Sequence, residues 1–157
     1  MSYTSEAINF LQGTGKSSSG YTLKQIILWE DEHDFIQWLF PNDKPSNFNP
    51  DCPVLDAKII NLMKMDPKVR QGVLEAYERF LGFCSLNHGE NGLEHEVFKN
   101  HIWGHRNHNW FRITRVLRCL SLLGYQSHLD ELLCFVTSLK NVDDDTIAHW
   151  KKAILTR

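Results

Sequence analysis

Apolar residues recur along this chain at the three- and four-residue intervals of amphipathic helices, while the alternation typical of strands is scarce. The clearest start signal is Asp66-Pro67, an N-cap aspartate followed by proline at the first helical position. The stripe that follows predicts a long helix and consists of Val69, Val73, Leu74, Tyr77, Phe80, Leu81 and Cys84.

A second long helix is predicted from about residue 109 to Gly124, which can close it, while Asn107 or Asn109 can cap its start. Its apolar face consists of Ile113, Val116, Leu117, Leu120 and Leu123. Shorter helices are predicted from Tyr21 to a bend near residue 31, from there to Pro41, over 56–65, over 93–103 after a break at 87–92, over 127–139, and from 143–145 onward. The pattern predicts an all-α fold of about seven to eight helices.

Residues 41–54 contain four of the five prolines, so this segment is predicted to be an extended loop. Because the loop also carries Phe48 and Val54, we expect it to pack on the core. The 157 residues suit one domain, over 1–157, with a partly flexible N-terminal segment at 1–20.

The composition is that of a globular, soluble protein, with 42% hydrophobic and 23% charged residues. The formal net charge of −2 does not favour nucleic acid as a partner. The four cysteines are widely spaced, and neither a signal peptide nor a transmembrane stretch is apparent. We therefore expect a cytoplasmic protein with reduced thiols.

The stretch "FLQGTGKSSSG" (10–20) superficially resembles a phosphate-binding loop. A Walker A loop would need glycine at position 10, which is Phe10, and it would follow a strand and open a helix. We therefore interpret the stretch as a flexible Gly/Ser connector and expect no nucleotide partner and no cofactor.

Histidines and arginines gather in residues 99–118. His101, His105 and His108 have spacings that could place imidazoles together around a metal ion, although Gly104 interrupts the helix and no H-E-x-x-H motif is present. Arg106, Arg112, Arg115 and Arg118 could bind an anion, or could pair with the acidic run Glu30 to Asp34. No set of nucleophile, base and orienting group can be assigned.

Two segments, "HDFIQWLFP" (33–41) and "HNWFRITRVLRCLSLLG" (108–124), resemble the conserved domain of the opioid growth factor receptor family. Supporting similarities are "GYTLKQIILW", "PSNFNPDCPVL", "AYERFLGF" and "TIAHWKKAI", so that the resemblance runs from about Phe10 to Ile154. The stretch between Trp29 and His33 is shorter than is usual in the family, and Trp110 replaces a small or polar residue. A chain that ends with the domain resembles a minimal, bacterial-type member.

The resemblance implies a helical domain that in vertebrate members belongs to a receptor for a peptide, the opioid growth factor Met-enkephalin, associated with the nucleus and membrane. For this chain it favours a binding domain of uncharacterised function, with a peptide or a small anionic ligand as partner. We expect a polar cleft formed by His33, Asp34, Gln37, Trp38, His108, Asn109, Arg112 and Arg115.

Within that cleft, we predict that Asp34 pairs with Arg112 or Arg115, because buried arginine favours bidentate carboxylate partners. Two alternatives remain open. One is a metal-dependent or other hydrolase that uses the His/Arg/Asn cluster at 101–115, and the other is a structural domain in which these polar residues only organise the core. The sequence does not determine the oligomeric state.

Overall fold

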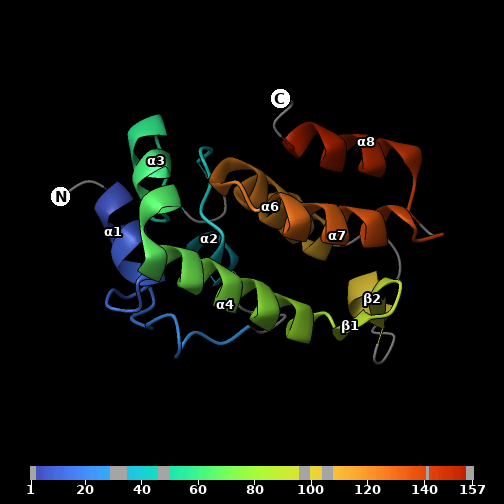
Figure 1. Ribbon diagram of the computed structural model, residues 1–157, viewed down its shortest axis with the longest axis horizontal. Helices are drawn as coiled ribbons and strands as arrows, with labels where there is room; N and C mark the ends of the chain where they lie inside the picture. The colour runs from blue at the N-terminus through green and yellow to red at the C-terminus, as the bar shows by residue number, and fades with distance from the viewer. Residues whose placement is uncertain are drawn as a thin grey trace. The chain divides into compact units, whose positions relative to one another are not determined.

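The computed structural model describes residues 3–28, 35–45, 50–95, 100–103, 108–140 and 142–154, with residues 3–5, 100, 101 and 108 described by their backbone alone. By its internal contacts the chain divides into two compact units, residues 1–80 and 81–157. The predicted single domain over 1–157 stays a prediction. Figure 1 shows that helices make up most of both units.

Unit 1 contains α1 (Tyr3–Leu11), α2 (Phe35–Leu39), α3 (Ala57–Met65) and α4 (Pro67–Phe83), whose last turn passes into unit 2. The predicted helix starts are confirmed. The Asp56 carboxylate accepts a hydrogen bond of 2.9 Å from the Ile59 N–H, and Asp66 accepts from the Lys68 and Val69 N–H groups at 2.9 and 3.2 Å.

The core of unit 1 combines aromatic and aliphatic side chains. Phe10 meets Trp38 edge-on with ring centroids 5.4 Å apart, and Phe40 meets Phe80 at 5.7 Å. Leu74 was predicted on the buried stripe of α4, but it is 38% exposed, because it lies about 100° around the helix from the buried Val73. The other buried side chains include Leu11, Leu23, Ile26, Phe35, Leu39, Met63, Val69, Val73 and Tyr77.

The sequence pattern did not predict α1, whose last residues Phe10 and Leu11 are fully buried. The glycine-containing stretch that follows closes this helix. The N–H of Gly13 donates to the Phe10 carbonyl at 3.0 Å, and the Gly15 N–H donates to the Asn9 carbonyl at 2.9 Å. Gly13 has φ +92°, which favours glycine. The stretch therefore ends a helix, whereas a phosphate-binding loop opens one.

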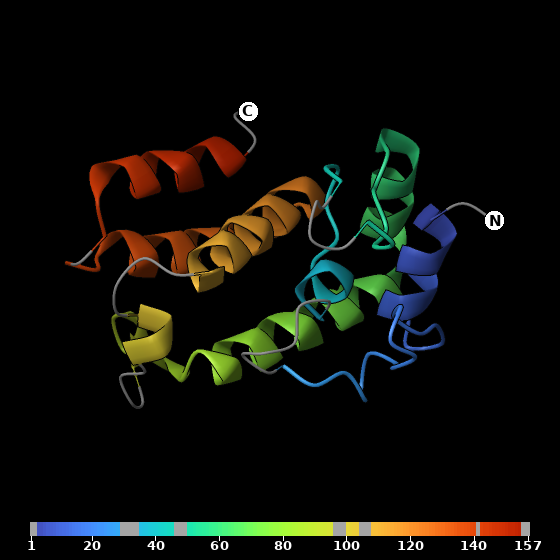
Figure 2. The same cartoon turned by 180° about the vertical axis from the view of Figure 1, so that it is seen from behind.

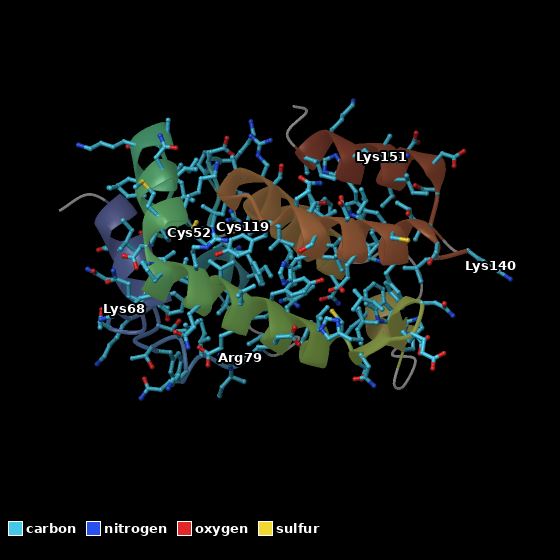
Figure 3. All side chains as sticks on the ribbon, in the orientation of Figure 1. Cys52, Lys68, Arg79, Cys119, Lys140 and Lys151 are labelled. Atoms are coloured by element: carbon cyan, nitrogen blue, oxygen red, sulfur yellow. The ribbon has the colours of Figure 1, made fainter. Side chains whose placement is uncertain are left out.

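The helix predicted from Tyr21 is wrong: residues 21–28 form turns. Leu23 and Ile26 are buried nevertheless, because a turn can also bring residues three apart to the same side of the chain. Their carbonyl oxygens accept hydrogen bonds from the Arg79 guanidinium of α4, with 2.6 Å between Arg79 Nη1 and the Leu23 oxygen. Figure 3 labels Arg79 on α4.

The described parts of the proline-rich loop confirm that it packs on the core. Pro41, Asn42, Cys52 and Pro53 are buried. The N–H of Leu55 donates to the Asn42 carbonyl at 2.8 Å, which ties the two ends of the loop together. Phe48 lies outside the described residues.

After the last turn of α4, unit 2 contains a hairpin of β1 (Leu86–Gly89) and β2 (Gly92–His95), which corrects the all-α prediction to a mostly helical fold with a small sheet. The strands are antiparallel, with Gly89 opposite Gly92, and Gly92 has φ +110°. Four-residue strands are too short to give a reliable alternation signal, so the sequence indicated a break at 87–92 followed by a helix over 93–103. That helix is wrong at residues 93–95, which belong to β2, while Asn100–Trp103 are helical.

The helices of unit 2 are α5 (Asn100–Trp103), α6 (His108–Leu123), α7 (Gln126–Thr137) and α8 (Asp144–Ala153). Helix α6 packs against both α7 and α8, and α7 also contacts β2; Figure 2 shows these elements from behind. Gly124, with φ +81°, ends α6 as predicted. Among the described residues no helix is both long and apolar enough to span a bilayer.

Both ends of α8 are hydrogen-bonded by side chains. Asp143 caps its start by accepting from the Thr146 N–H at 2.7 Å. Arg118 of α6 donates to the Ala153 carbonyl at the other end at 3.2 Å, where a cation also suits the helix dipole. Arg118, one of the arginines considered for anion binding, thus has a structural role here.

Candidate functional site

Two of the predicted cleft residues, Gln37 and Trp38, lie on α2 in unit 1, and both are buried. The Trp38 indole N–H donates to the Ser18 hydroxyl at 3.3 Å while its ring packs on Phe10. Trp38 is therefore part of the core of this unit. The preceding residues of the motif, His33 and Asp34, lie outside the described residues.

Three further predicted residues lie on α6 in unit 2. Asn109 and Arg112 are buried, and Arg112 Nη1 donates to Asn109 Oδ1 at 2.9 Å. The guanidinium also lies over the Phe83 ring, 5.8 Å from its centroid, a cation–π distance. Arg115 is half-buried. The structure therefore brings Asn109 and Arg112 together in the first turns of α6.

The cleft as a whole stays a prediction, because its residues are divided between the two units. The pairing of Asp34 with Arg112 or Arg115 also stays a prediction, since Asp34 lies outside the described residues. The same applies to the His108 side chain.

The predicted metal ligands His101, His105 and His108 stay a prediction, because their side chains lie outside the described residues. Within the described ranges no group of three or more His, Cys, Asp or Glu side chains could hold a metal ion. His88 contacts Glu131, with 3.4 Å between Nδ1 and the carboxylate. A metal site at 101–108 therefore stays a prediction.

The four cysteines are free thiols. Cys52, Cys84 and Cys119 are buried, and Cys134 is exposed. Figure 3 labels Cys119 on α6. Burial raises the pKa of Cys119 to about 12, and the opposing effect of the nearby Arg115 charge is smaller. The Cys119 thiol is therefore protonated at neutral pH and is not an activated nucleophile.

Among the described residues of unit 2, an aromatic hollow lies between α6 and α8. Its cavity volume is about 20 Å³, room for one small polar group or a water molecule. The rings of Trp110 and Trp150 meet edge-on at 5.9 Å. The residues that line it are Trp110, Phe111, Thr114, Thr146, His149 and Trp150.

Hydrogen bonds fix the back of this hollow. The Trp150 indole N–H donates to the Trp110 carbonyl at 3.1 Å, and the Thr114 hydroxyl donates to the same oxygen at 3.1 Å. Because a carbonyl oxygen has two lone pairs, the acceptor capacity of Trp110 is fully used. The Trp150 donor is also satisfied.

Two side-chain polar atoms on residues that line the hollow lack a hydrogen-bond partner among the described residues. They are Trp110 Nε1 and Thr146 Oγ1, and both are buried. Their residues are only 4% and 5% exposed. Leaving a buried donor unpaired costs about 1–3 kcal/mol.

Sequence reasoning singled out Trp110 as a departure from the family pattern and did not assign Trp150 to a site. The signal that could have found the hollow is weak. Trp110 and the exposed Phe111 lie on α6 and Trp150 lies on α8, and nothing in the sequence pairs the two helices.

The described residues form a mostly helical protein with a short β-hairpin. The family model described as "Opioid growth factor receptor (OGFr) conserved region" matches residues 21–156, and the chain belongs to this family. The resemblance seen in the two motifs is thereby confirmed, while the bacterial type stays a prediction.

The chain is similar to several mammalian proteins. It is 32% identical over 116 residues to the opioid growth factor receptor of Homo sapiens, and the match covers 69% of this chain and 17% of the human protein. It is 31% identical over 134 residues to opioid growth factor receptor-like protein 1 of Mus musculus, and the match covers 80% of this chain and 28% of the mouse protein. The chain thus spans less than a third of these relatives. No solved structure matches it.

Proposed function

We propose that this chain is a peptide-binding domain and that its ligand docks at the α6–α8 hollow. The observation that carries the proposal is the aromatic hollow itself, two of whose lining residues, Trp110 and Thr146, also bury a polar side-chain atom without a partner among the described residues. Binding sites commonly combine apolar walls with a few polar groups that fix orientation. The hollow has this composition.

A peptide suits the site for two reasons. Its backbone offers a carbonyl acceptor at every residue, and its side chains can pack on the exposed ring of Phe111, which is 57% exposed. The relatives are named as receptors for opioid growth factor, which the sequence resemblance identifies with the peptide Met-enkephalin. We extend the peptide-binding role, although not that particular ligand, to this chain.

In this proposal the polar residues of the α6 motif position the hollow rather than contact the ligand. Asn109 and Arg112 are buried and hydrogen-bonded to each other, and Trp110 follows Asn109 directly in the sequence. A fixed first turn of α6 therefore fixes where the Trp110 indole lies. The predicted contribution of Gln37 and Trp38 to a shared cleft is not needed for this role.

The proposal can be tested by selecting peptides from a random-sequence display library on the folded protein and titrating the selected peptides by calorimetry. Met-enkephalin and a scrambled version are titrated in parallel. We expect saturable binding of selected peptides at one site per chain, with a change in tryptophan emission. If the library yields no binder while the protein is folded, the proposed function is wrong.

A further inference from the structure

We infer that the junction of α3 and α4 binds an acidic, partly apolar segment of another protein. This surface is independent of the peptide site proposed in unit 2, because all of its residues lie in unit 1. It combines exposed apolar side chains with basic side chains around them. We call it the α3–α4 corner, and it consists of Lys58, Leu62, Lys64, Met65, Lys68 and Arg70.

The apolar part of the corner lies on the outer face of α3. Met65 is 81% exposed, more than any other large hydrophobic residue that the structure describes, and Leu62 is 49% exposed. Because they are three residues apart on a helix, they lie on the same face. Ile59 and Met63 are buried, so α3 already contributes its inner face to the core of unit 1. The outer face is apolar surface left in water, which a partner can cover.

Basic side chains surround these two apolar residues. Residues 57–70 carry four cations against one carboxylate, Asp66, whereas the whole chain has a formal net charge of −2. Lys58 lies four residues before Leu62 on α3 and is exposed. Lys68, in the first turn of α4, is also exposed and is labelled in Figure 3. Positive charge is therefore concentrated here in a chain that is negative overall.

A hydrogen bond joins the basic part of α4 to the apolar end of α3. Arg70 Nη1 donates to the Lys64 carbonyl oxygen at 3.3 Å, so the guanidinium lies beside the last turn of α3, which contains Met65. Figure 1 shows α3 meeting α4 at this point. The Asp66 carboxylate between the helices accepts from the Gln12 side chain at 2.6 Å, which ties the corner to the segment after α1. The apolar and basic groups are thus held on one surface.

The chemistry of the corner defines its partner. Carboxylates on the partner complement the four cations, and apolar side chains between those carboxylates cover Leu62 and Met65. The unbranched thioether of Met65 adapts to apolar groups of different shape. The corner is small, so we expect a transient complex whose formation depends strongly on electrostatic attraction.

An anionic membrane also offers negative charge beside apolar groups, but the surroundings of the corner disfavour it. The exposed carboxylates of Asp51 and Asp56 precede α3, and that of Glu78 follows on α4. A membrane is a broad surface and brings its negative charge near these carboxylates as well, whereas a narrow segment meets only the corner. A protein segment is therefore the partner that fits.

The test uses the full chain and the peptide Glu-Glu-Leu-Leu-Glu-Glu-Leu-Leu-Glu, which carries fluorescein at its N-terminus and an amide at its C-terminus. One control peptide has lysine in place of every glutamate, and a second has serine in place of every leucine. Fluorescence anisotropy measures affinity at low salt. We expect the acidic peptide to bind about tenfold or more tightly than either control, and added salt to weaken it.

NMR spectra of carbon-13-labelled methionine methyl groups locate the bound peptide. The chain has three methionines, and the Met65 signal is assigned from Met65→Leu. We expect the acidic peptide to shift the Met65 signal and to leave the signal of the buried Met63 unchanged.

Substitutions in the protein test the charges and the apolar contact separately. Lys58→Glu combined with Lys68→Glu should weaken the acidic peptide about tenfold or more. Lys24→Glu combined with Lys140→Glu changes the charge equally at exposed lysines outside the corner and should alter the affinity less than about twofold. Met65→Ser should weaken the peptide about threefold or more, whereas Met65→Leu should preserve binding because it keeps an apolar side chain. Circular dichroism confirms that each variant is folded.

An unchanged Met65 signal, or equal affinity for the acidic peptide and its lysine counterpart, would overturn the inference. Vesicles of phosphatidylserine and phosphatidylcholine in equal parts are tested by sedimentation, and the chain should stay in the supernatant. Sedimentation that Lys58→Glu with Lys68→Glu abolishes would assign the corner to a membrane and would also overturn the inference. None of these results bears on the α6–α8 hollow, which the library selection tests.

Discussion

Gly72 of α4 lies directly against the carbonyl group of Leu11, the last residue of α1. A Cβ atom added at Gly72 would stand 1.8 Å from the Leu11 oxygen and 2.9 Å from its carbonyl carbon. No carbon can approach a backbone oxygen so closely, so the two helices touch at this point only because residue 72 has no side chain. The close approach fixes how α1 packs in unit 1.

Gly72→Ala is therefore expected to destabilise the protein by about 1–3 kcal/mol, the usual cost of overpacking, or by more because the obstacle is backbone rather than a side chain. Urea unfolding followed by circular dichroism measures the change. Gly82→Ala in the same helix is the control, because an added Cβ there meets nothing within 4 Å. The control should be neutral or stabilising by about 0.5–1 kcal/mol through helix propensity. Equal stability of the two variants would contradict this account.

Arg79 holds the turn segment 21–28 to α4 through the carbonyl oxygens of Leu23 and Ile26. Arg79→Lys keeps the charge but loses the planar fork that reaches two acceptors at once. We expect a loss of about 1.5–3 kcal/mol, the typical range for hydrogen bonds to charged groups. Limited proteolysis should show faster cleavage within 21–28 in the variant, as measured by mass spectrometry. A cleavage pattern identical to that of the wild type would show that other contacts hold the segment.

The parts of the fold that were predictable from sequence are those fixed by local chemistry. Asp66 followed by Pro67 specifies a helix start without reference to the rest of the chain, and Gly124 specifies a helix end. The failure at 21–28 has a non-local cause, since the Arg79 that bonds the turn lies more than fifty residues further along the chain. The β-hairpin was missed because its strands are only four residues long.

The candidate site was likewise predictable from the sequence only in part. Asn109 and Arg112 are three residues apart on one helix, so their proximity followed from the helical pattern. The hollow depends on Trp110 and Trp150, which come from different helices and meet only through the packing of α8 on α6. A single sequence contains no information that pairs residues forty positions apart.

The cysteines should differ sharply in reactivity. Cys134 is the exposed one, whereas Cys52 and Cys84 are buried and burial raises the pKa of Cys119 to about 12. Brief treatment of the native protein with iodoacetamide at pH 8 should therefore modify Cys134 first, since the thiolate is the reactive form and must be accessible. Peptide mass spectrometry identifies the site. In urea all four should react, and rapid native labelling of Cys119 would contradict its burial.

His95 of β2 makes the stability of unit 2 sensitive to acid. Its ring lies edge-on to Phe135 and Trp103, with centroids 5.0 and 5.8 Å away, and burial lowers its pKa from the ordinary value of 6.5. As the pH falls through about 6.5, the unfolded chain takes up a proton that the folded chain does not. The free energy of unfolding therefore decreases below that pH and levels off below the folded pKa.

Urea unfolding at pH 7.5 and 5 should show that acid lowers the free energy of unfolding less in His95→Gln than in the wild type. His149→Gln, at an exposed histidine, should retain the wild-type dependence, and an undiminished acid loss in His95→Gln would assign the effect to other groups.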